Sequence, residues 1–156
     1  DGTIPLVPER IDLALLTESV VGHLSIPESS TVTIADAPSV AYADPVRVRQ
    51  VIRNLLTNAF RYGGSTITAS YGVVDGYAHV DIHDDGPGIP AEDRDAVFEA
   101  YGRSRSGSMV KASVGLGLTL SRRLARLMDG DLDLVAGEGI GCTFRLTLPL
   151  PTPDDR

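Results

Sequence analysis

The sequence predicts a single α+β domain in which helices alternate with short strands. At 156 residues the chain is long enough for one substantial hydrophobic core and too short for two. A helix is predicted over residues 45–62, because apolar side chains recur there at the i, i+3, i+4, i+7 spacing of one buried stripe. Two alternating strands, 65–74 and 77–84, flank Asp75-Gly76, a favoured two-residue hairpin turn. Two more strands follow a second amphipathic helix near the end of the chain.

The composition argues against several classes of function. A formal net charge of -7 and a pI near 4.8 disfavour a general nucleic-acid or anionic-membrane surface, because phosphate groups select basic faces. The lone cysteine, Cys142, cannot form an internal disulfide, and its place in a strand favours a small buried hydrophobe over a nucleophile. With no signal peptide and no apolar run of about 18 residues, we expect a soluble, cytoplasmic domain. The abrupt start at Asp1 suggests a piece excised from a parent that could itself be membrane-bound.

The segment before the helix over 45–62 is predicted to contain three short strands and one helix. Residues 9–12 alternate and are expected to form an edge strand, after which Asp12 caps a helix that ends near residue 23. Residues 31–35 and 40–43 are β-rich runs separated by turn-forming residues, which predicts a hairpin. Asp44 then provides the N-cap of the next helix.

Three polar side chains share one face of the predicted helix over 45–62. Asn54, Asn58 and Arg61 lie at i, i+4 and i+7, with Tyr62 at the helix end. Inside a helix Asn lowers helix stability by roughly half a kcal/mol relative to Ala, so two asparagines one turn apart suggest a functional role. This polar ridge is either a solvated face or a metal or phosphate site whose neutral oxygen ligands stand beside a cation.

A carboxylate is predicted at the buried end of the strand over 77–84. Alternation places Asp84 on the same face as Val80 and Ile82. An unpaired buried carboxylate costs several kcal/mol or loses its charge, so Asp84 needs the polar ridge or a ligand with N–H donors. Residues 85–90 follow with two glycines, which let the backbone approach something flat or crowded.

The opposite face of the same strand carries His79, Asp81 and His83. This pattern could be interpreted as a metal site. No fourth ligand is apparent nearby, so a solvated polar face is the simpler interpretation.

Between residues 90 and 114 the sequence predicts a short helix and then a long loop. The helix covers 90–98 and has an acidic first turn. Residues 102–114 are rich in Gly, Ser, Arg and Lys and show no period. Loops of about a dozen residues inside a compact domain are usually lids or binding loops, and disorder without function is the alternative.

A second amphipathic helix is predicted from Gly115-Leu116-Gly117-Leu118 to about residue 128. Its inward face is expected to carry Leu120, Leu124 and Leu127, and its outward face Arg122, Arg123 and Arg126. Glycines at a helix start expose unpaired N–H groups at the positive end of the dipole, which favours an anion. Strands over 132–136 and 142–148 and a polar tail from Pro149 complete the chain.

Four motifs, taken in order, resemble the ATP-binding catalytic domain of sensor histidine kinases, the Bergerat-type fold shared with gyrase, Hsp90 and MutL ATPases. The motifs are Asn54 with Asn58 on a helix, Asp84-x-Gly86-x-Gly88, Phe98 with Arg103, and Gly115-x-Gly117. The resemblance implies an α+β fold, a two-layer α/β sandwich with a mixed sheet of about five strands, three helices on one face and an ATP lid. The resemblance also implies that residues 1–156 form a single domain whose core covers about 9–149.

The resemblance also implies which residues contact the nucleotide and its metal. Asn58 corresponds to the asparagine that ligates the magnesium bridging the phosphates, and Asn54 lies one turn before it. Arg61 stands at a position that is usually a lysine contacting phosphate. The arginine at this position is a departure from the family pattern. Asp84 corresponds to the acceptor of the adenine amino group. The implied ATP-binding set is Tyr62, Asp84, Gly86, Gly88, Ile89, Arg103, Gly115, Leu116, Gly117, Leu118 and Thr143, the last as a hydroxyl that supports Asp84. A second departure is Ser113, where many members have glycine.

By resemblance, the domain binds Mg-ATP and donates the γ-phosphoryl group to a histidine on a separate dimerisation domain of a two-component sensor kinase, with a response regulator downstream. His23, His79 and His83 lack the context of such an acceptor, and neither nucleic acid nor membrane is an expected partner. Alternatives are an anti-sigma-factor-type serine kinase or ATPase of the same fold, or a non-catalytic nucleotide-sensing module. Hydrolytic relatives carry glutamate where Asn54 stands, so the amide favours a kinase.

Overall fold

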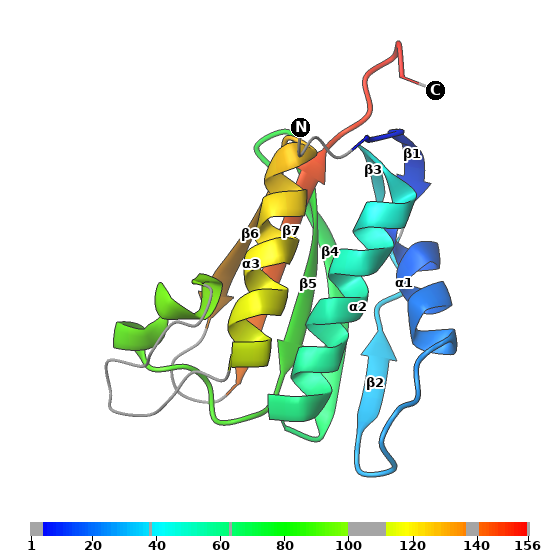
Figure 1. Cartoon of the computed structure of the whole chain (residues 1–156). Coiled ribbons are helices and arrows are strands. Elements are labelled where there is room, and N and C mark those ends of the chain that lie inside the picture. Colours follow the sequence, from blue (N-terminus) through cyan, green and yellow to red (C-terminus); the bar gives the residue numbers. More distant parts are fainter. Residues whose placement is uncertain (1–4, 38, 63, 100–111, 137–140, 156) are drawn as a thin grey trace.

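The chain folds into two layers, a mixed five-stranded sheet and three helices that cover one of its faces (Figure 1). The structure is a computed structural model that describes residues 5–37, 39–62, 64–99, 112–136 and 141–155. In chain order the elements are β1 (Glu9–Asp12), α1 (Leu13–Gly22), β2 (Thr31–Ile34), β3 (Val40–Ala43), α2 (Pro45–Tyr62), β4 (Thr66–Val74), β5 (Tyr77–Asp84), the 3-10 turns η1 (Ala91–Asp93) and η2 (Ala96–Phe98), α3 (Ala112–Leu127), β6 (Asp131–Ala136) and β7 (Cys142–Pro149). The predicted α+β two-layer fold is confirmed.

The main sheet has the strand order β2-β4-β5-β7-β6. Strands β2 and β4 are parallel and every other neighbouring pair is antiparallel, which makes the sheet mixed. The hairpin between β4 and β5 is confirmed, since Asp75 and Gly76 have φ values of 53° and 82°, as in a type I′ turn. Strand β5 thus lies at the centre of the sheet, and its end carries Asp84.

The predicted hairpin between residues 31–35 and 40–43 is wrong. Strand β2 instead pairs in parallel with β4, and β3 pairs with β1 in a separate two-stranded sheet. Ala41 and Ala43 are 0% and 1% exposed, so β3 is anchored in the core, whereas β2 is a half-buried edge strand. A local turn signal between two β-rich runs does not distinguish pairing with a neighbour from pairing with a strand far along the chain.

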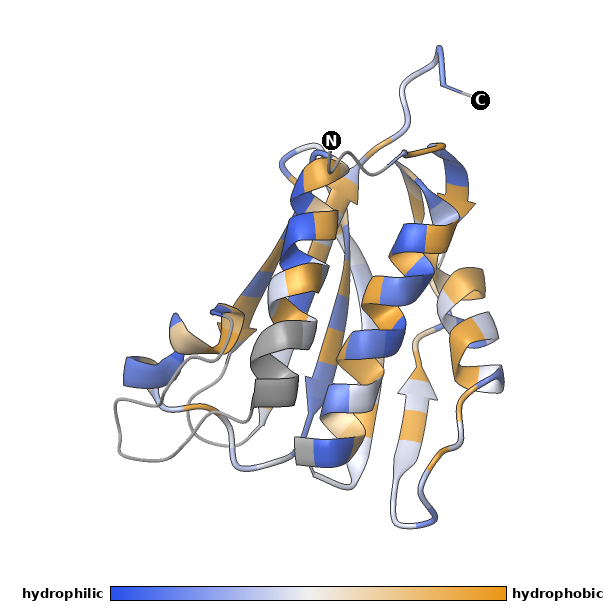
Figure 2. Cartoon of the chain, in the orientation of Figure 1, coloured by the Kyte–Doolittle hydropathy of each residue, from blue (hydrophilic) through white to orange (hydrophobic). Residues whose placement is uncertain are grey.

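Helix α2 carries the predicted buried stripe. Its core residues are Val48, Val51, Ile52, Leu55, Leu56 and Ala59, each at most 5% exposed. Figure 2 shows these hydrophobic positions alternating with hydrophilic ones around the helix. Asp44 caps the helix through a bond from the Val46 N–H to Oδ1 (2.9 Å), and its Oδ2 accepts from the Val7 N–H (3.0 Å). The cap therefore also fixes the incoming N-terminal segment.

Two predictions about α3 are corrected. The helix begins at Ala112, so residues 112–114 are helical although the sequence suggested a loop. Leu120 and Leu127 are 45% and 44% exposed, although both were expected to face inward. From residue 117 onward the buried positions of α3 are Leu118, Ser121, Leu124 and Ala125, and Met128 just after the helix is buried too. The stripe includes a buried serine, and a pattern search that counts only apolar residues overlooks it.

Residues 90–98 form two separate 3-10 turns, η1 and η2, where the sequence predicted one short helix. The segment is too short for a stable α-helix, because helix nucleation is costly and few residues follow to repay it. The two turns direct Asp93, Ala96 and Val97 inward, each less than 9% exposed. Among the described residues, no helix is long and apolar enough to span a lipid bilayer.

Candidate functional site

Four elements that carry the motif residues meet at one end of the molecule. The C-terminal end of α2, the end of β5, the start of α3 and the start of β7 all lie at the lower end in Figure 1. Helices α2 and α3 pack side by side over the sheet there. The fold therefore brings Asn54, Asn58, Asp84 and Gly117 into one region.

The seam between α2 and α3 is closed by a hydrogen bond from Asn54 to Ser121. The Nδ2 of Asn54 donates to Oγ of Ser121 at 3.0 Å, and Ser121 is only 3% exposed. Gly117 permits this close approach, because a Cβ added there would lie 2.6 Å from Asn54 Oδ1. The bond orients the Asn54 carboxamide. Ser121 escaped sequence analysis, although a polar residue on the buried side of α3 was a signal for it.

One turn further along α2, the Asn58 carboxamide is partly buried and incompletely paired. Its Nδ2 is buried and finds no hydrogen-bond partner among the described residues. Leaving a buried donor unsatisfied costs about 1–3 kcal/mol, so such a group is unusual unless a ligand or solvent completes it. The Nδ2 of Asn58 is therefore a hydrogen-bond donor that is available to a ligand.

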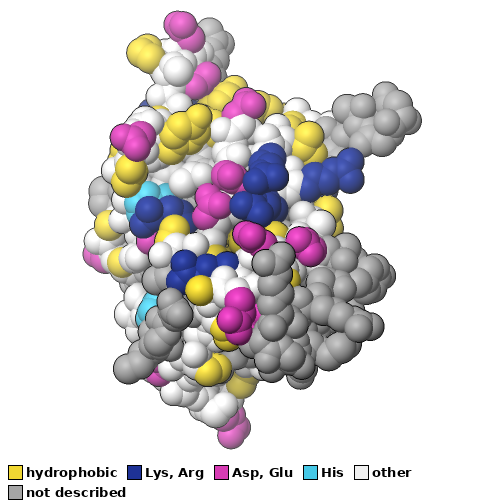
Figure 3. Space-filling model, turned by 90° about the vertical axis from the view of Figure 1, so that its left-hand side faces the viewer, with side chains coloured by type: hydrophobic (Ala, Val, Ile, Leu, Met, Phe, Trp, Pro, Cys, Tyr) yellow, Lys and Arg dark blue, Asp and Glu magenta, His cyan; other side chains and the backbone are white. Residues whose placement is uncertain are grey.

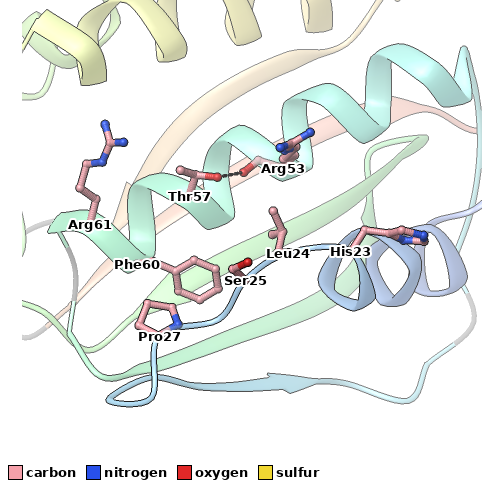
Figure 4. A pocket seen from close by; sticks show the side chains of 8 residues that line it. All are labelled: His23, Leu24, Ser25, Pro27, Arg53, Thr57, Phe60 and Arg61. Carbon is pink, nitrogen blue, oxygen red and sulfur yellow. Dashed lines mark hydrogen bonds between the residues drawn. The ribbon is translucent and has the colours of Figure 1, made fainter.

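Arg61 is exposed and lines a groove between α2 and the loop after α1, together with Phe60 and Pro27 (Figure 4). Its long side chain projects from the helix. The role of Arg61 beside the two asparagines therefore stays a prediction.

Asp84 is 7% exposed and lies at the inner end of β5, as alternation predicted. Its Oδ1 accepts a hydrogen bond from the Gly86 N–H at 2.9 Å. Burial raises the pKa of Asp84 above its ordinary value, and the bond from Gly86 opposes that shift. A smaller opposing contribution comes from the backbone of Gly64. An ionised carboxylate has about four acceptor sites, so Asp84 retains acceptor capacity for a ligand.

The loop after Asp84 is held at both sides. Asp85 accepts from the Thr66 N–H at 2.9 Å, and this bond lowers the pKa of Asp85. The Gly86 carbonyl accepts from the Gly141 N–H at 2.8 Å, which ties the loop to the start of β7. Gly88 has a φ of 78°, a left-handed conformation that favours glycine. Ile89 packs against the core, so the loop is supported from below.

The structure does not place Thr143 beside Asp84. In the β5–β7 register Thr143 lies opposite His83, and its Oγ1 is 2.6 Å from His83 Nδ1. The residue opposite Asp84 is Cys142, and paired residues point to the same face of a sheet. Expecting Thr143 there was an error of one position, which in a strand reverses the face. Sequence analysis missed Cys142 as a site residue, because the register of β7 has no local signal.

Cys142 is buried, as predicted. It is 5% exposed, and burial together with the neighbouring Asp84 raises the pKa of its thiol to about 12. The thiol is therefore neutral, and a thiolate nucleophile is disfavoured.

The remaining expected site residues occupy helix ends or lie outside the described residues. Tyr62 ends α2, and Gly115 and Leu116 belong to the first turns of α3. Leu118 is fully buried in the core. Arg103 and most of the expected lid, residues 102–111, lie outside the described residues. Because α3 begins at Ala112, its free N–H groups are those of residues 112–115, which include Gly115 and exclude Gly117.

The face of β5 remote from the helices is a network of paired charges. Arg145 donates to both oxygens of Asp81 at 2.8 and 3.0 Å, and His79 Nδ1 lies 3.2 Å from Asp81 Oδ1. His79 is 8% exposed, so the prediction of a solvated histidine is wrong there. Its ring lies over Gly72, where a Cβ would be 2.6 Å from Nε2. Figure 3 views the molecule from the side on which β6 lies, where cationic and anionic side chains are also interleaved.

Comparison with known proteins agrees with this geometry. Residues 43–152 match the family described as histidine kinase-, DNA gyrase B-, and HSP90-like ATPase. The adaptive-response sensory kinase SasA of Nostoc sp. is 33% identical over 159 residues, which cover 96% of this chain and 39% of that protein. The chain thus spans about two-fifths of that relative's length.

Two solved structures share the fold. The mycobacterial sensor histidine kinase MprB has a TM-score of 0.76 at 24% identity, with 94% of this chain and 100% of that chain covered. Full-length ShkA, solved in complex with AMPPNP, has a TM-score of 0.74 at 28% identity, with 97% and 33% covered. The chain therefore belongs to the histidine kinase-, DNA gyrase B- and HSP90-like ATPase family. The predicted resemblance to the ATP-binding catalytic domain of sensor histidine kinases is confirmed.

Proposed function

We propose that this domain binds Mg-ATP between α2, α3 and the loop after β5, and donates the γ-phosphoryl group to a histidine on a separate dimerisation domain. The observation that carries this proposal is Asp84, a buried carboxylate at the end of the central strand whose protein donors are backbone N–H groups, chiefly that of Gly86. The family match and the AMPPNP complex of ShkA support a nucleotide as its ligand.

Asp84 would select adenine. An ionised carboxylate accepts from the amino group of adenine, whereas guanine offers a carbonyl oxygen at the corresponding position. Gly86, Gly88 and Ile89 form the supported loop beside it and would pack against the base, and Tyr62 at the end of α2 would lie by the nucleoside. Burial of Asp84 strengthens this selection, because a buried acceptor left unpaired is costly.

The amide side chains fit a magnesium ion that is held mainly by phosphates. Magnesium prefers oxygen ligands and usually takes only one or two from the protein, with phosphates and water completing its shell. Asn58 would supply such an oxygen through its Oδ1, while its buried, unpaired Nδ2 is a donor suited to a phosphate oxygen, and Asn54 is oriented one turn away by Ser121. Bound magnesium would neutralise charge that develops on the transferred phosphoryl group.

The phosphates would extend toward the start of α3. The free N–H groups of residues 112–115 stand at the positive end of that helix and favour an anion. Arg61 and Arg103 are the candidate cations for the phosphates. Residues 116–118 would position the helix turn that carries the free N–H groups. The acceptor histidine, the dimerisation domain that carries it and the downstream response regulator would be supplied by other parts of the signalling system.

Titration calorimetry of this domain with ATP and GTP, each with and without magnesium, tests the proposal. We expect ATP to bind with magnesium-dependent affinity and GTP to bind at least about tenfold more weakly, in keeping with discrimination by a buried hydrogen-bonding group. Mixing the ATP complex with a histidine-containing dimerisation domain of a related sensor kinase should then yield acid-labile phosphohistidine. Equal affinity for ATP and GTP would contradict adenine recognition by Asp84. ATP binding without any phosphoryl transfer would indicate a non-catalytic nucleotide-sensing module.

A further inference from the structure

Helix α2 is strongly cationic within an acidic chain. It carries Arg47, Arg49, Arg53 and Arg61 and no aspartate or glutamate, although the formal charge of the chain is -7. None of these four arginines forms an ion pair among the described residues, whereas Arg122, Arg126 and Arg145 each pair with an aspartate. Arg47 and Arg49 have only neutral hydrogen-bond partners, Gln50 and Ser19, so the positive charge of α2 is not neutralised by an acidic side chain among the described residues.

A groove of about 450 Å³ lies beside this charge, between α2 and the loop that follows α1. Its lining residues are His23, Leu24, Ser25, Pro27, Arg53, Thr57, Phe60 and Arg61. Figure 4 shows Phe60 pointing across the groove towards Pro27, while Arg53 and Arg61 project from the helix. Leu24 and Phe60 also pack against the hydrophobic core, which makes the floor apolar and firm. The groove therefore combines an apolar floor with a cationic rim.

We propose that this groove is the docking site of an acidic amphipathic helix of a partner protein. Arg53 and Arg61 are eight residues apart, about 12 Å along the axis of α2. Two glutamates seven residues apart on a partner helix lie on one face at about 10 Å, a separation that flexible arginine side chains match. An apolar side chain between these glutamates would reach the floor at Phe60.

The charge distribution also confines such a partner to this groove. The chain as a whole is acidic and Arg122, Arg126 and Arg145 are each paired with an aspartate, so the four arginines of α2, which have no ion pair among the described residues, favour an acidic helix here, and this attraction weakens as salt screens it. This inference goes beyond the proposed function. Arg61 stands at the end of the groove and is also a candidate phosphate contact, so the test relies on Arg53 and Ser25, which belong to opposite walls. Arg53 also borders the pocket beside Asn54 and Gly117, whereas Ser25 does not.

The test measures binding of a labelled, alanine-rich helical peptide by fluorescence anisotropy. The probe carries Glu, Leu and Glu at positions i, i+3 and i+7, and the control peptide has Gln in place of both Glu residues. We expect the Glu peptide to bind at least about fivefold more tightly than the Gln peptide at low salt. We expect that advantage to shrink several-fold at about 0.2 M salt. Equal binding of the two peptides would overturn the proposal.

Matched charge changes in the protein locate the binding surface. Arg53→Glu on α2 and Ser25→Glu on the facing loop should each weaken binding of the Glu peptide by about three- to tenfold. Arg123→Glu, the same charge change as Arg53→Glu and a larger one than Ser25→Glu, lies at an exposed position outside this groove and should change binding by less than about twofold. Thermal melting should be unchanged in all three variants, and ATP affinity should be unchanged in Ser25→Glu and Arg123→Glu, neither of which borders the pocket beside Asn54. An equal loss in Arg123→Glu, or binding of phosphatidylserine vesicles through Arg53 in place of the peptide, would contradict a protein helix as the occupant.

Discussion

Asp84 and Cys142 lie directly opposite each other in the neighbouring strands β5 and β7. Both are buried, and the charge of Asp84 contributes to the raised pKa of the thiol. A thiol is a weak hydrogen-bond donor, so the carboxylate has little help from this neighbour. The next residue, Thr143, carries a hydroxyl but directs it to His83 on the other face.

Cys142→Thr should therefore strengthen ATP binding. A hydroxyl beside Asp84 can donate to the carboxylate and favour its ionised form, for a gain of about 0.5–1.5 kcal/mol, or about two- to tenfold in affinity. Thr143→Ala is the matched control and should change ATP affinity by less than about twofold, because its side chain faces away. If calorimetry found the larger change in ATP affinity for Thr143→Ala, Thr143 and not residue 142 would be the residue that supports Asp84.

Asp84→Asn should separate binding from stability. We expect ATP affinity to fall by about 2–4 kcal/mol, because an amide presents a donor where a carboxylate accepts in a buried pocket. Stability at neutral pH should be unchanged or higher, since the substitution removes a buried charge whose pKa burial has raised. Asp75→Asn, at the exposed hairpin turn, makes the same chemical change outside the site and should affect neither quantity. A large loss of thermal stability in Asp84→Asn would show that the carboxylate is structural.

The raised pKa of Asp84 also predicts a pH dependence of opposite sign for stability and binding. Because the folded-state pKa lies above the ordinary 3.8, the contribution of Asp84 to stability is fully present below that value and is lost as the pH rises through the raised pKa. ATP binding needs the ionised carboxylate and should weaken as the pH falls through the same raised pKa. Calorimetry across this range, with Asp84→Asn as the control that lacks the titration, measures the effect. An ATP affinity with the same pH profile in both proteins would contradict it.

Local signals predicted much of this fold, and pairings between distant segments account for most of the errors. The stripe of α2 and the turn at Asp75-Gly76 depend on periodicity and turn chemistry within a few residues, and both are confirmed. The partner of β2 and the register of β7 depend on strands far along the chain. No local pattern decides between Thr143 and Cys142 as the neighbour of Asp84.

The same distinction applies to the site. Burial of Asp84 follows from alternation along one strand and could be predicted. The bond from Asn54 to Ser121 joins two helices and could not, because it depends on how closely they approach. That approach in turn depends on Gly117, whose role in the sequence resembled that of a phosphate-binding glycine.

Gly117→Ala should destabilise the domain. Its Cβ would lie 2.6 Å from Asn54 Oδ1, so the amide must move and the bond to Ser121 would be strained or lost. We expect about 1–3 kcal/mol lower unfolding free energy, the usual cost of overpacking, and weaker magnesium-dependent ATP binding. Gly22→Ala is the matched control, since nothing lies within 4 Å of a Cβ there, and it should be neutral within about 0.5 kcal/mol. Equal denaturation midpoints for the two variants would show that α3 shifts freely along α2.

The final prediction concerns hydrolysis of ATP by the isolated domain. Attack by water requires a base, and the Asn54 carboxamide, already donating to Ser121, is not basic at neutral pH. We therefore expect slow hydrolysis and no self-phosphorylation. Asn54→Glu should raise the ATPase rate, because a carboxylate at this position can accept a proton from water and still accept a bond from the Ser121 hydroxyl.

Two further variants distinguish a new base from a disturbed helix contact. Ser121→Ala removes the same interhelical bond without supplying a base, so its ATPase rate should stay at the level of the unmodified domain. Asn58→Ala should abolish the magnesium dependence of ATP binding, because it removes the amide oxygen proposed to ligate the ion. Phosphate release and filter binding with labelled ATP measure these quantities. Brisk hydrolysis by the unmodified domain that is lost in Asn58→Ala would instead indicate an ATPase, because water would then be the natural acceptor and no docked histidine would be required.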